Sequence, residues 1–188
     1  ALLAQISPAQ TITDNFTDPA NWGTPLAAPA KNIFVGSGRM NFTSTTSGDG
    51  GAIIPRNTPI LPTTKDWSLK VDVHVDPFII STHDQGASVF LGVGKTDDLL
   101  NTYVILGFDR DWWYPDFYGV NDDVRSNGLD APGLFNVNYL PSPDAALRLD
   151  YSAANHTITY YCDSDGAGNG DNWVVLGTAN IASGTYDL

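Results

Sequence analysis

Residues 147–178, LRLDYSAANHTITYYCDSDGAGNGDNWVVLGT, decide the fold. Apolar and charged side chains alternate over the first five residues, so they fall on opposite faces of a β-strand. A similar alternation returns at residues 158–162 after a short turn, and the Gly-, Asn- and Asp-rich residues 163–172 make a second turn before a third apolar run. The stretch therefore predicts a three-stranded antiparallel meander with one face in a core.

The same stretch carries four short motifs: L-x-L-x-Y from Leu147, T-I-T-x-Y from Thr157, D-x-D-G from Asp163 and W-x-x-L-G from Trp173. Near the start of the chain, Asp14-Asn15-Phe16 is followed by Trp22. This combination resembles the laminin-G-like and concanavalin-A-like jelly rolls of secreted bacterial proteins. The resemblance implies an all-β fold, a two-sheet antiparallel jelly-roll β-sandwich, in an extracellular setting. It identifies no ligand, because that fold carries lectins, glycosidases, lyases, adhesion modules and structural subunits alike.

The length of the chain, 188 residues, suits one sizeable core and is short for two. We expect a single jelly-roll domain over residues 11–188, preceded by an N-terminal extension or strand-donor segment at residues 1–10. The N-terminal residues have no basic segment and too short an apolar run for a signal peptide or a membrane span. We therefore expect a mature exported chain, secreted or held at the cell surface, with no membrane insertion.

Further strands are indicated by alternation elsewhere in the chain. Residues 67–75 alternate most regularly, with apolar side chains inward and polar ones outward, and a hairpin is predicted at residues 32–43. Residues 87–93 and 102–108 are apolar on both faces, which is typical of strands in the middle of a covered sheet. Their apolar residues are predicted to form two faces, one with Val89, Leu91, Tyr103 and Ile105 and the other with Phe90, Val104, Leu106 and Phe108.

The negative charge of the chain excludes some classes of binding partner. The formal net charge is -12, and a surface of that sign repels phosphate backbones and anionic lipid headgroups, so no nucleic-acid partner is expected. All 21 acidic residues are Asp and none is Glu, and the short Asp stem favours turns, caps and cation ligation. Cys162 is the only cysteine, so no internal disulfide can form, and its inward position predicts a small buried apolar side chain.

The strongest candidate binding loop is DRDWWYPDFY, residues 109–118. Flat aromatic rings at a loop tip stack on the apolar faces of sugar rings, while Asp and Arg side chains bind the sugar hydroxyls. The predicted ligand-binding residues are Asp109, Arg110, Asp111, Trp112, Trp113, Tyr114, Asp116 and Tyr118. The alternative is that the rings fold back over the end of the core and cap it.

The acidic turn at residues 163–171 resembles a calcium loop, because hard cations need several oxygen ligands from a flexible, Gly-containing turn. The predicted metal ligands are Asp163, Asp165, Asn169 and Asp171. The turn departs from the helix-loop-helix calcium loop in having Ala167 at a ligand position and Val174 in place of the terminal Glu. A solvated hairpin turn is the alternative.

Catalysis is not expected. Retaining glucanases of the jelly-roll group use a Glu-x-Asp-x-x-Glu-type strand motif, and this chain has no Glu. A glycan-active enzyme would need an Asp pair such as Asp109 and Asp116. Asp72, His74 and Asp76 are spaced about 6 to 7 Å apart along one strand face, too far for a single metal without ligands from other strands, and they are interpreted as a solvated face.

Three functions remain open. A non-catalytic carbohydrate-binding or adhesion module with structural calcium accounts for the aromatic loop, the acidic turns and the exported composition together. A self-assembling subunit of a surface layer, sheath or filament would use the same acidic turns for calcium bridges between copies. The third, an Asp-dependent glycan-active enzyme, has the least support. The predicted partners are therefore an extracellular glycan or other copies of the chain.

The end of the meander carries one more expectation. In the jelly rolls that the chain resembles, a further long strand normally follows W-x-x-L-G, whereas residues 179–188 are rich in Gly, Ser and Ala. The apolar residues 1–6 could fill the missing place, within their own chain or as a strand added to a neighbouring copy. Alternatively, the natural chain continues past Leu188, or residues 186–188 begin a short closing strand.

Overall fold

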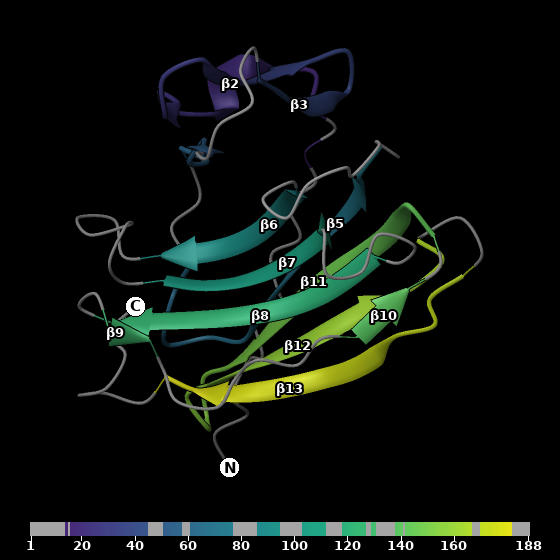
Figure 1. Cartoon of the computed structure of the whole chain (residues 1–188). Helices are drawn as coiled ribbons and strands as arrows, with labels where there is room; N and C mark the ends of the chain where they lie inside the picture. The colour runs from purple at the N-terminus through teal and green to yellow at the C-terminus, as the bar shows by residue number, and fades with distance from the viewer. Residues whose placement is uncertain are drawn as a thin grey trace. The chain divides into compact units, whose positions relative to one another are not determined.

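The computed structural model describes residues 14, 16–44, 51–57, 61–76, 86–94, 103–111, 118–126, 129–130, 138–140, 142–166 and 170–181. The chain forms two compact units, Ala1–Leu61 and Pro62–Leu188, and most of their strands are labelled in Figure 1. Regular structure in the described residues is β-strand, apart from one turn of 3-10 helix, Pro19–Asn21 (η1). The expectation of an all-β chain is confirmed. The expectation of one domain over residues 11–188 stays a prediction.

The first unit contains β1 (Leu26–Ala27), β2 (Lys31–Gly36), β3 (Arg39–Ser44) and β4 (Ala52–Ile53). β2 and β3 form the hairpin that the sequence predicts, and β1 pairs with β4. The two-residue turn of the hairpin has φ 56° at Ser37 and 72° at Gly38. Positive φ at both positions is the geometry of a type I′ turn, whose twist matches that of paired antiparallel strands.

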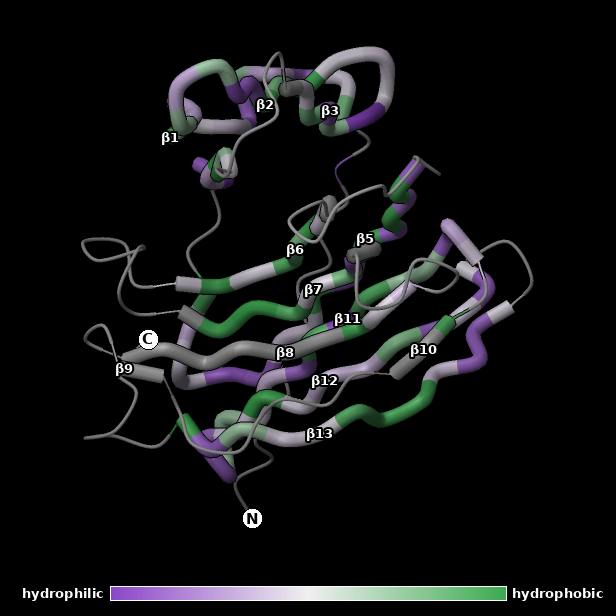
Figure 2. Tube along the Cα trace, in the orientation of Figure 1, coloured by the Kyte–Doolittle hydropathy of each residue, from purple (hydrophilic) through white to green (hydrophobic). Residues whose placement is uncertain are grey.

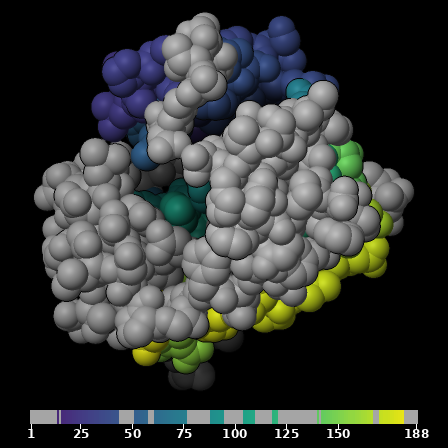
Figure 3. All heavy atoms as spheres, viewed as in Figure 1, coloured from purple at the N-terminus to yellow at the C-terminus, as the bar shows by residue number. Residues whose placement is uncertain are grey.

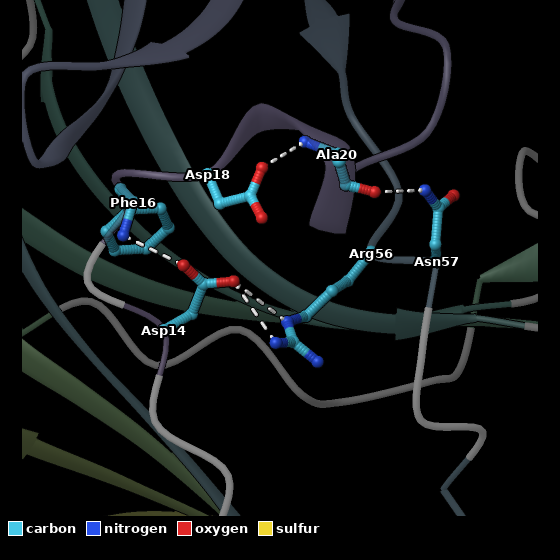
Figure 4. Close-up of polar contacts among 6 residues, drawn as sticks. All are labelled: Asp14, Phe16, Asp18, Ala20, Arg56 and Asn57. Carbon is cyan, nitrogen blue, oxygen red and sulfur yellow. Dashed lines mark hydrogen bonds and ion pairs between the residues drawn. The ribbon is translucent and has the colours of Figure 1, made fainter.

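Polar contacts fasten the two ends of the first unit to each other (Figure 4). The carboxylate of Asp14 accepts a hydrogen bond from the backbone N–H of Phe16 at 2.8 Å and one from Nη2 of Arg56 at 3.1 Å. Asn57 donates from Nδ2 to the backbone of η1 at 3.1 Å. Phe16 stacks on Trp22 with ring centroids 5.5 Å apart. The segment from Asp14 to Trp22 is therefore held against Arg56 and Asn57 by an ion pair and a hydrogen bond, while the aromatic stack lies within the segment itself.

In its described residues the second unit has nine strands: β5 (Trp67–His74), β6 (Gly86–Gly94), β7 (Tyr103–Asp111), β8 (Tyr118–Ser126), β9 (Leu129–Asp130), β10 (Asn138–Leu140), β11 (Asp144–Ser152), β12 (Thr157–Asp163) and β13 (Val174–Asn180). Among the described residues they form two antiparallel sheets. One has the order β10-β8-β7-β6 with β9 beside β8, and the other has the order β13-β12-β11-β5. β13, yellow in Figure 3, runs along the border of the unit in that view.

The predicted meander is β11, β12 and β13. β11 pairs with β12 from Ala146 to Ser152, and β12 pairs with β13 with one register shift at Tyr160 and Tyr161. Leu147 and Leu149 are fully buried, as the alternation predicts. The alternation of β5 is also confirmed, since its polar side chains are exposed and its apolar ones face the core.

One apolar core joins the two sheets of the second unit. It contains Leu106 and Phe108 from β7 together with Leu149 and Tyr160 from β11 and β12. Two sheets that bury their inner faces against each other make a β-sandwich-like arrangement. Cys162 lies in this core as predicted, and burial raises the pKa of its thiol to about 12, so the thiol stays protonated.

The strand order in each sheet follows the chain. The path runs from β5 into the other sheet, through β6, β7, β8 and β10 in turn, and then returns to β11 beside β5. The connection between β5 and β11 is therefore the long one in the second unit. The finer jelly-roll topology stays a prediction.

β6 corrects one expectation from the sequence. β7 lies between β6 and β8 as predicted, and Figure 2 shows its apolar stretch. β6, in contrast, is the last strand of its sheet in the described part of the chain, and Phe90 is 53% exposed. Apolar residues on both faces of a strand are therefore not enough to place that strand in the middle of a sheet.

The predicted faces of β6 and β7 are also wrong. Val89 lies opposite Phe108 and Leu91 opposite Leu106, so these four share the core face. Ile105 lies opposite Gly92, where an added Cβ would come within 2.7 Å of the Ile105 side chain. Alternation within each strand was correct, but the faces of two strands can be matched only once their register is known.

Candidate functional site

The predicted aromatic loop lies only partly in the described residues. β7 ends with Asp109, Arg110 and Asp111, and β8 begins at Tyr118. Tyr118 is in the core, 6% exposed, and stacks on Phe108 with ring centroids 5.4 Å apart. Its ring therefore lies in the core rather than on the surface. Trp112, Trp113, Tyr114 and Asp116 are outside the described residues, so the loop as a ligand site stays a prediction.

The acidic turn is organised around Asp163. This side chain is fully buried at the end of β12. Its Oδ1 accepts from the backbone N–H of Asp165 at 3.4 Å, and its Oδ2 accepts from the backbone N–H of Asn172 at 3.0 Å. Asp171 is exposed and pairs with Lys70 instead. Asn169 lies outside the described residues.

Asp163 carries a charge in spite of its burial. Desolvation is the largest influence and opposes ionisation, but hydrogen bonds from Asp165 and Asn172 and the charge of Lys70 together outweigh it, so the pKa of Asp163 is lowered. A carboxylate held by backbone N–H groups fixes both segments that donate to it. Asp163 therefore anchors the end of the turn that leads into Trp173.

The segment that contains Asp171 and Trp173 crosses the outer face of its sheet. β13 and β5 are at opposite ends of the four-stranded order, roughly 14 Å apart at the usual strand spacing. Nevertheless Asp171, two residues before Trp173, lies 3.1 Å from Nζ of Lys70 on β5. Nζ of Lys70 is also 5.1 Å from the centre of the Trp173 ring. Trp173 thus lies over the sheet instead of extending along the line of β13.

Six side chains meet where Trp173 lies, and we call them the Trp173 cluster: Lys70, Arg148, Asp150, Tyr161, Asp171 and Trp173. Arg148 is their centre, since it is the register partner of both Lys70 and Tyr161 on the neighbouring strands. Its Cζ lies 4.9 Å from the Tyr161 ring centre and 5.6 Å from the Trp173 ring centre. Cations at these distances from aromatic rings are attracted by the rings.

Two ion pairs complete the Trp173 cluster. Arg148 donates from Nε to Asp150 at 2.8 Å and from Nη2 to the other carboxylate oxygen. The hydrogen bond with Asp150 is the largest cause that raises the pKa of Arg148. The side chains of Arg148 and Lys70 are 32% and 38% exposed, and that of Asp171 is 63% exposed. The cluster therefore presents aromatic rings, N–H donors and carboxylate acceptors together on a partly open surface.

The sequence indicated that several of these side chains face outward, but it did not indicate that they lie together. Arg148, Asp150 and Lys70 have the outward position in their alternating strands, and Trp173 belongs to the W-x-x-L-G motif. Only Asp171 was among the predicted site residues, as a metal ligand. The missing information was the pairing of β5 with β11, which joins residues far apart in the chain.

His74 forms a second polar group on the same sheet. Its Nδ1 lies 2.7 Å from Asp144 Oδ1, and its Nε2 lies 3.0 Å from Asp76 Oδ1. The hydrogen bond with Asp144 is the largest cause that raises the pKa of His74. The side chain is 47% exposed, which agrees with the predicted solvated face. Because each ring nitrogen faces a carboxylate, the imidazolium form is favoured and neither nitrogen is offered to a metal.

Comparison with known proteins finds no matching family model, no matching curated protein and no matching solved structure. In the described part of the chain, no group of three or more His, Cys or Asp side chains is arranged to hold a metal ion. A search of the described residues also finds no helix long and apolar enough to cross a membrane. A functional proposal for this chain therefore depends on the geometry of its surface.

Proposed function

We propose that the chain is a secreted, non-catalytic carbohydrate-binding module that binds sugar at the Trp173 cluster. The observation that supports this is the position of Trp173, folded over a sheet face beside Arg148 and Tyr161. A large aromatic residue placed on a partly open polar surface, rather than in the core, provides a stacking face for a ligand. The two-sheet jelly roll is the topology we propose for the module.

The chemistry of the Trp173 cluster suits sugar. The C–H groups on one face of a pyranose pack on an indole ring, while its hydroxyls need hydrogen-bond donors and acceptors around the ring edge. Arg148 supplies donors in a fixed plane, and Asp150 and Asp171 supply acceptors. Because Asp163 anchors the segment that carries Trp173, the ring is held in place before a ligand arrives, and less ordering is required on binding.

Binding by Trp173 can be tested with a matched aromatic control. Isothermal titration calorimetry with a panel of oligosaccharides should show binding that Trp173→Ala weakens at least about tenfold, equal to 1.4 kcal/mol. Phe90→Ala is the control, because Phe90 is exposed on the other sheet and should leave the affinity unchanged. If both variants bind as the unchanged chain does, the Trp173 cluster is not the site.

Calcium at the acidic turn is part of the proposal. Asp163 and Asp165 are hydrogen-bonded neighbours in this turn, and a divalent cation would relieve the repulsion between their carboxylates. The melting temperature in calcium should then be higher than the melting temperature in EDTA. At a calcium concentration one hundred times the dissociation constant, binding should raise the free energy of unfolding by about 2.7 kcal/mol. Equal melting temperatures would leave the turn held by its hydrogen bonds alone.

A second candidate function is assembly of copies into an extracellular layer, sheath or filament. It is favoured by Val174 and Val175 on β13, which are 60% and 59% exposed, because exposed valines on the last strand of a sheet favour pairing between chains. The proposed donor, residues 1–6, lies outside the described residues. Sedimentation velocity should show assembly that is lost when residues 1–7 are deleted. A full-length chain that sediments as a monomer in calcium would rule this function out.

A further inference from the structure

The charges of the Trp173 cluster decide which class of sugar fits it. Arg148 is bound through two nitrogens to Asp150, and Lys70 is bound to Asp171. Each cation is thus already matched by a carboxylate at contact distance. An anionic sugar would have to displace one of these carboxylates or place its own negative charge beside it. Like charges brought together in this way oppose binding.

Two further carboxylates belong to the same face, beside the Trp173 cluster at the level of Ala146. Asp72 is two residues from Lys70 on β5, and both Asp72 and Asp163 are register partners of Ala146. This face therefore carries four carboxylates and two cations, in a chain whose net charge is -12. The potential at this face is negative, so it repels uronic acids and sulfated sugars before they make contact.

The same ion pairs suit an uncharged sugar. Neighbouring hydroxyls on a pyranose each carry one donor and two acceptor lone pairs, and an arginine-carboxylate pair offers N–H groups next to carboxylate oxygens. One hydroxyl can then accept from Arg148 while its neighbour donates to Asp150. Charge-assisted hydrogen bonds of this kind are stronger than those between neutral groups. An uncharged ligand also leaves both ion pairs intact.

We infer that the ligand of the Trp173 cluster is an uncharged glycan whose pyranose rings carry neighbouring hydroxyls, and not a uronic-acid or sulfated glycan. This inference rests on the proposed function, because it assigns the ligand class of the same site. It extends that function by giving the ion pairs a role: they exclude anionic glycans by charge and orient the hydroxyls of neutral ones.

The test compares neutral and anionic oligosaccharides on the full chain at low and at physiological salt. The neutral probes are glucan, mannan and xylan hexasaccharides, and the anionic probes are oligogalacturonate, oligoalginate and a heparin hexasaccharide. At least one neutral probe should bind at least about tenfold more tightly than every anionic probe. Asp150→Asn should weaken neutral binding about fivefold and strengthen anionic binding. Asp144→Asn is the matched control, since Asp144 lies on the same sheet beside His74, and it should change neither.

The outcomes separate the two claims. An anionic probe that binds best, and loses its binding in Trp173→Ala, would overturn the neutral-glycan inference and keep the proposed function. Binding of any probe that survives Trp173→Ala, or no binding of any probe at millimolar concentration, would overturn both. Neutral binding that is lost in Trp173→Ala but unaffected by Asp150→Asn would keep the proposed function and remove the role given to the ion pairs.

Discussion

The two units of the chain are stabilised in different ways. Core residues of the second unit come from both of its sheets, and several, such as Leu149 and Tyr160, have no exposed surface. In the described residues of the first unit, Ile33 is the one buried hydrophobic side chain, and Leu26, Phe34 and others are exposed. The first unit depends on its hairpin turn and on the contacts of Asp14 instead. A small unit with little buried apolar surface is expected to be marginally stable.

A binding surface can hold its side chains in fixed positions only where the strands beneath it are well packed. The Trp173 cluster belongs to the well-packed second unit, so its strands hold Arg148 and Lys70 in fixed register. In the first unit, the buried indole N–H of Trp22 has no acceptor among the described residues. An unsatisfied buried donor costs about 1 to 3 kcal/mol, which weakens a unit with few compensating contacts.

The largest expected effect is a loss of core packing in the second unit. Leu149→Ala removes a fully buried side chain and should lower the free energy of unfolding by about 2 to 5 kcal/mol. Ile33→Ala in the first unit should cost less than half as much, because a partly open surrounding leaves a smaller cavity. Urea denaturation followed by circular dichroism measures both. Equal losses would mean that the two units are packed alike.

A smaller effect is expected at the anchor of the Trp173 segment. Asp163→Ala removes the acceptor of two backbone N–H groups and should cost about 1 to 3 kcal/mol of stability. Because the pKa of Asp163 is lowered in the folded chain, its contribution is present above the unfolded pKa and is lost as pH falls through the folded pKa. Urea titrations from pH 2 to 7 should therefore differ between the variant and the unchanged chain mainly above pH 4. A pH-independent difference would contradict the anchoring role.

The smallest effect concerns His74. Its pKa is raised in the folded chain, so its contribution is fully present below about pH 6.5, the unfolded value, and is lost as pH rises through the folded pKa. The side chain is 47% exposed, so the contribution should stay below about 1 kcal/mol. His74→Gln should remove this pH dependence between pH 5 and 8. The first unit has no His, so its own unfolding should not respond to pH in this range.

The sequence predicted features that depend on residues close together in the chain, and it did not predict features that depend on residues far apart. Alternation at Leu147, Leu149 and Ile158 is a local signal, and it placed the meander and its buried face correctly. The Gly-containing turn of the first hairpin was also local. Register between strands distant in the chain is not a local property, so the faces of β6 and β7 were matched wrongly. For the same reason, the sequence could not predict that Lys70 lies opposite Arg148, which follows from the pairing of β5 with β11.

The residues of the candidate site also differ in whether local sequence or distant contacts determine their positions. Asp163 was predicted as a metal ligand from its acidic turn, and that role stays a prediction; the structure shows its oxygens bound to backbone N–H groups. Trp173 was placed in a strand motif, because nothing local indicates that its segment crosses the sheet. That crossing depends on contacts with Lys70, which precedes Trp173 by most of the length of the second unit.

The central claim is that sugar binds against Trp173, and the indole N–H signals of the chain test it most directly. The chain has five tryptophans, and Trp173→Phe identifies the signal of Trp173 in a nitrogen-proton NMR spectrum. On titration with the neutral hexasaccharide that binds best, the Trp173 signal should shift most, while that of Trp67, stacked on Tyr151, should stay in place. A Trp173 signal that stays unchanged while those of Trp112 or Trp113 shift would contradict the claim and place the site in the aromatic loop.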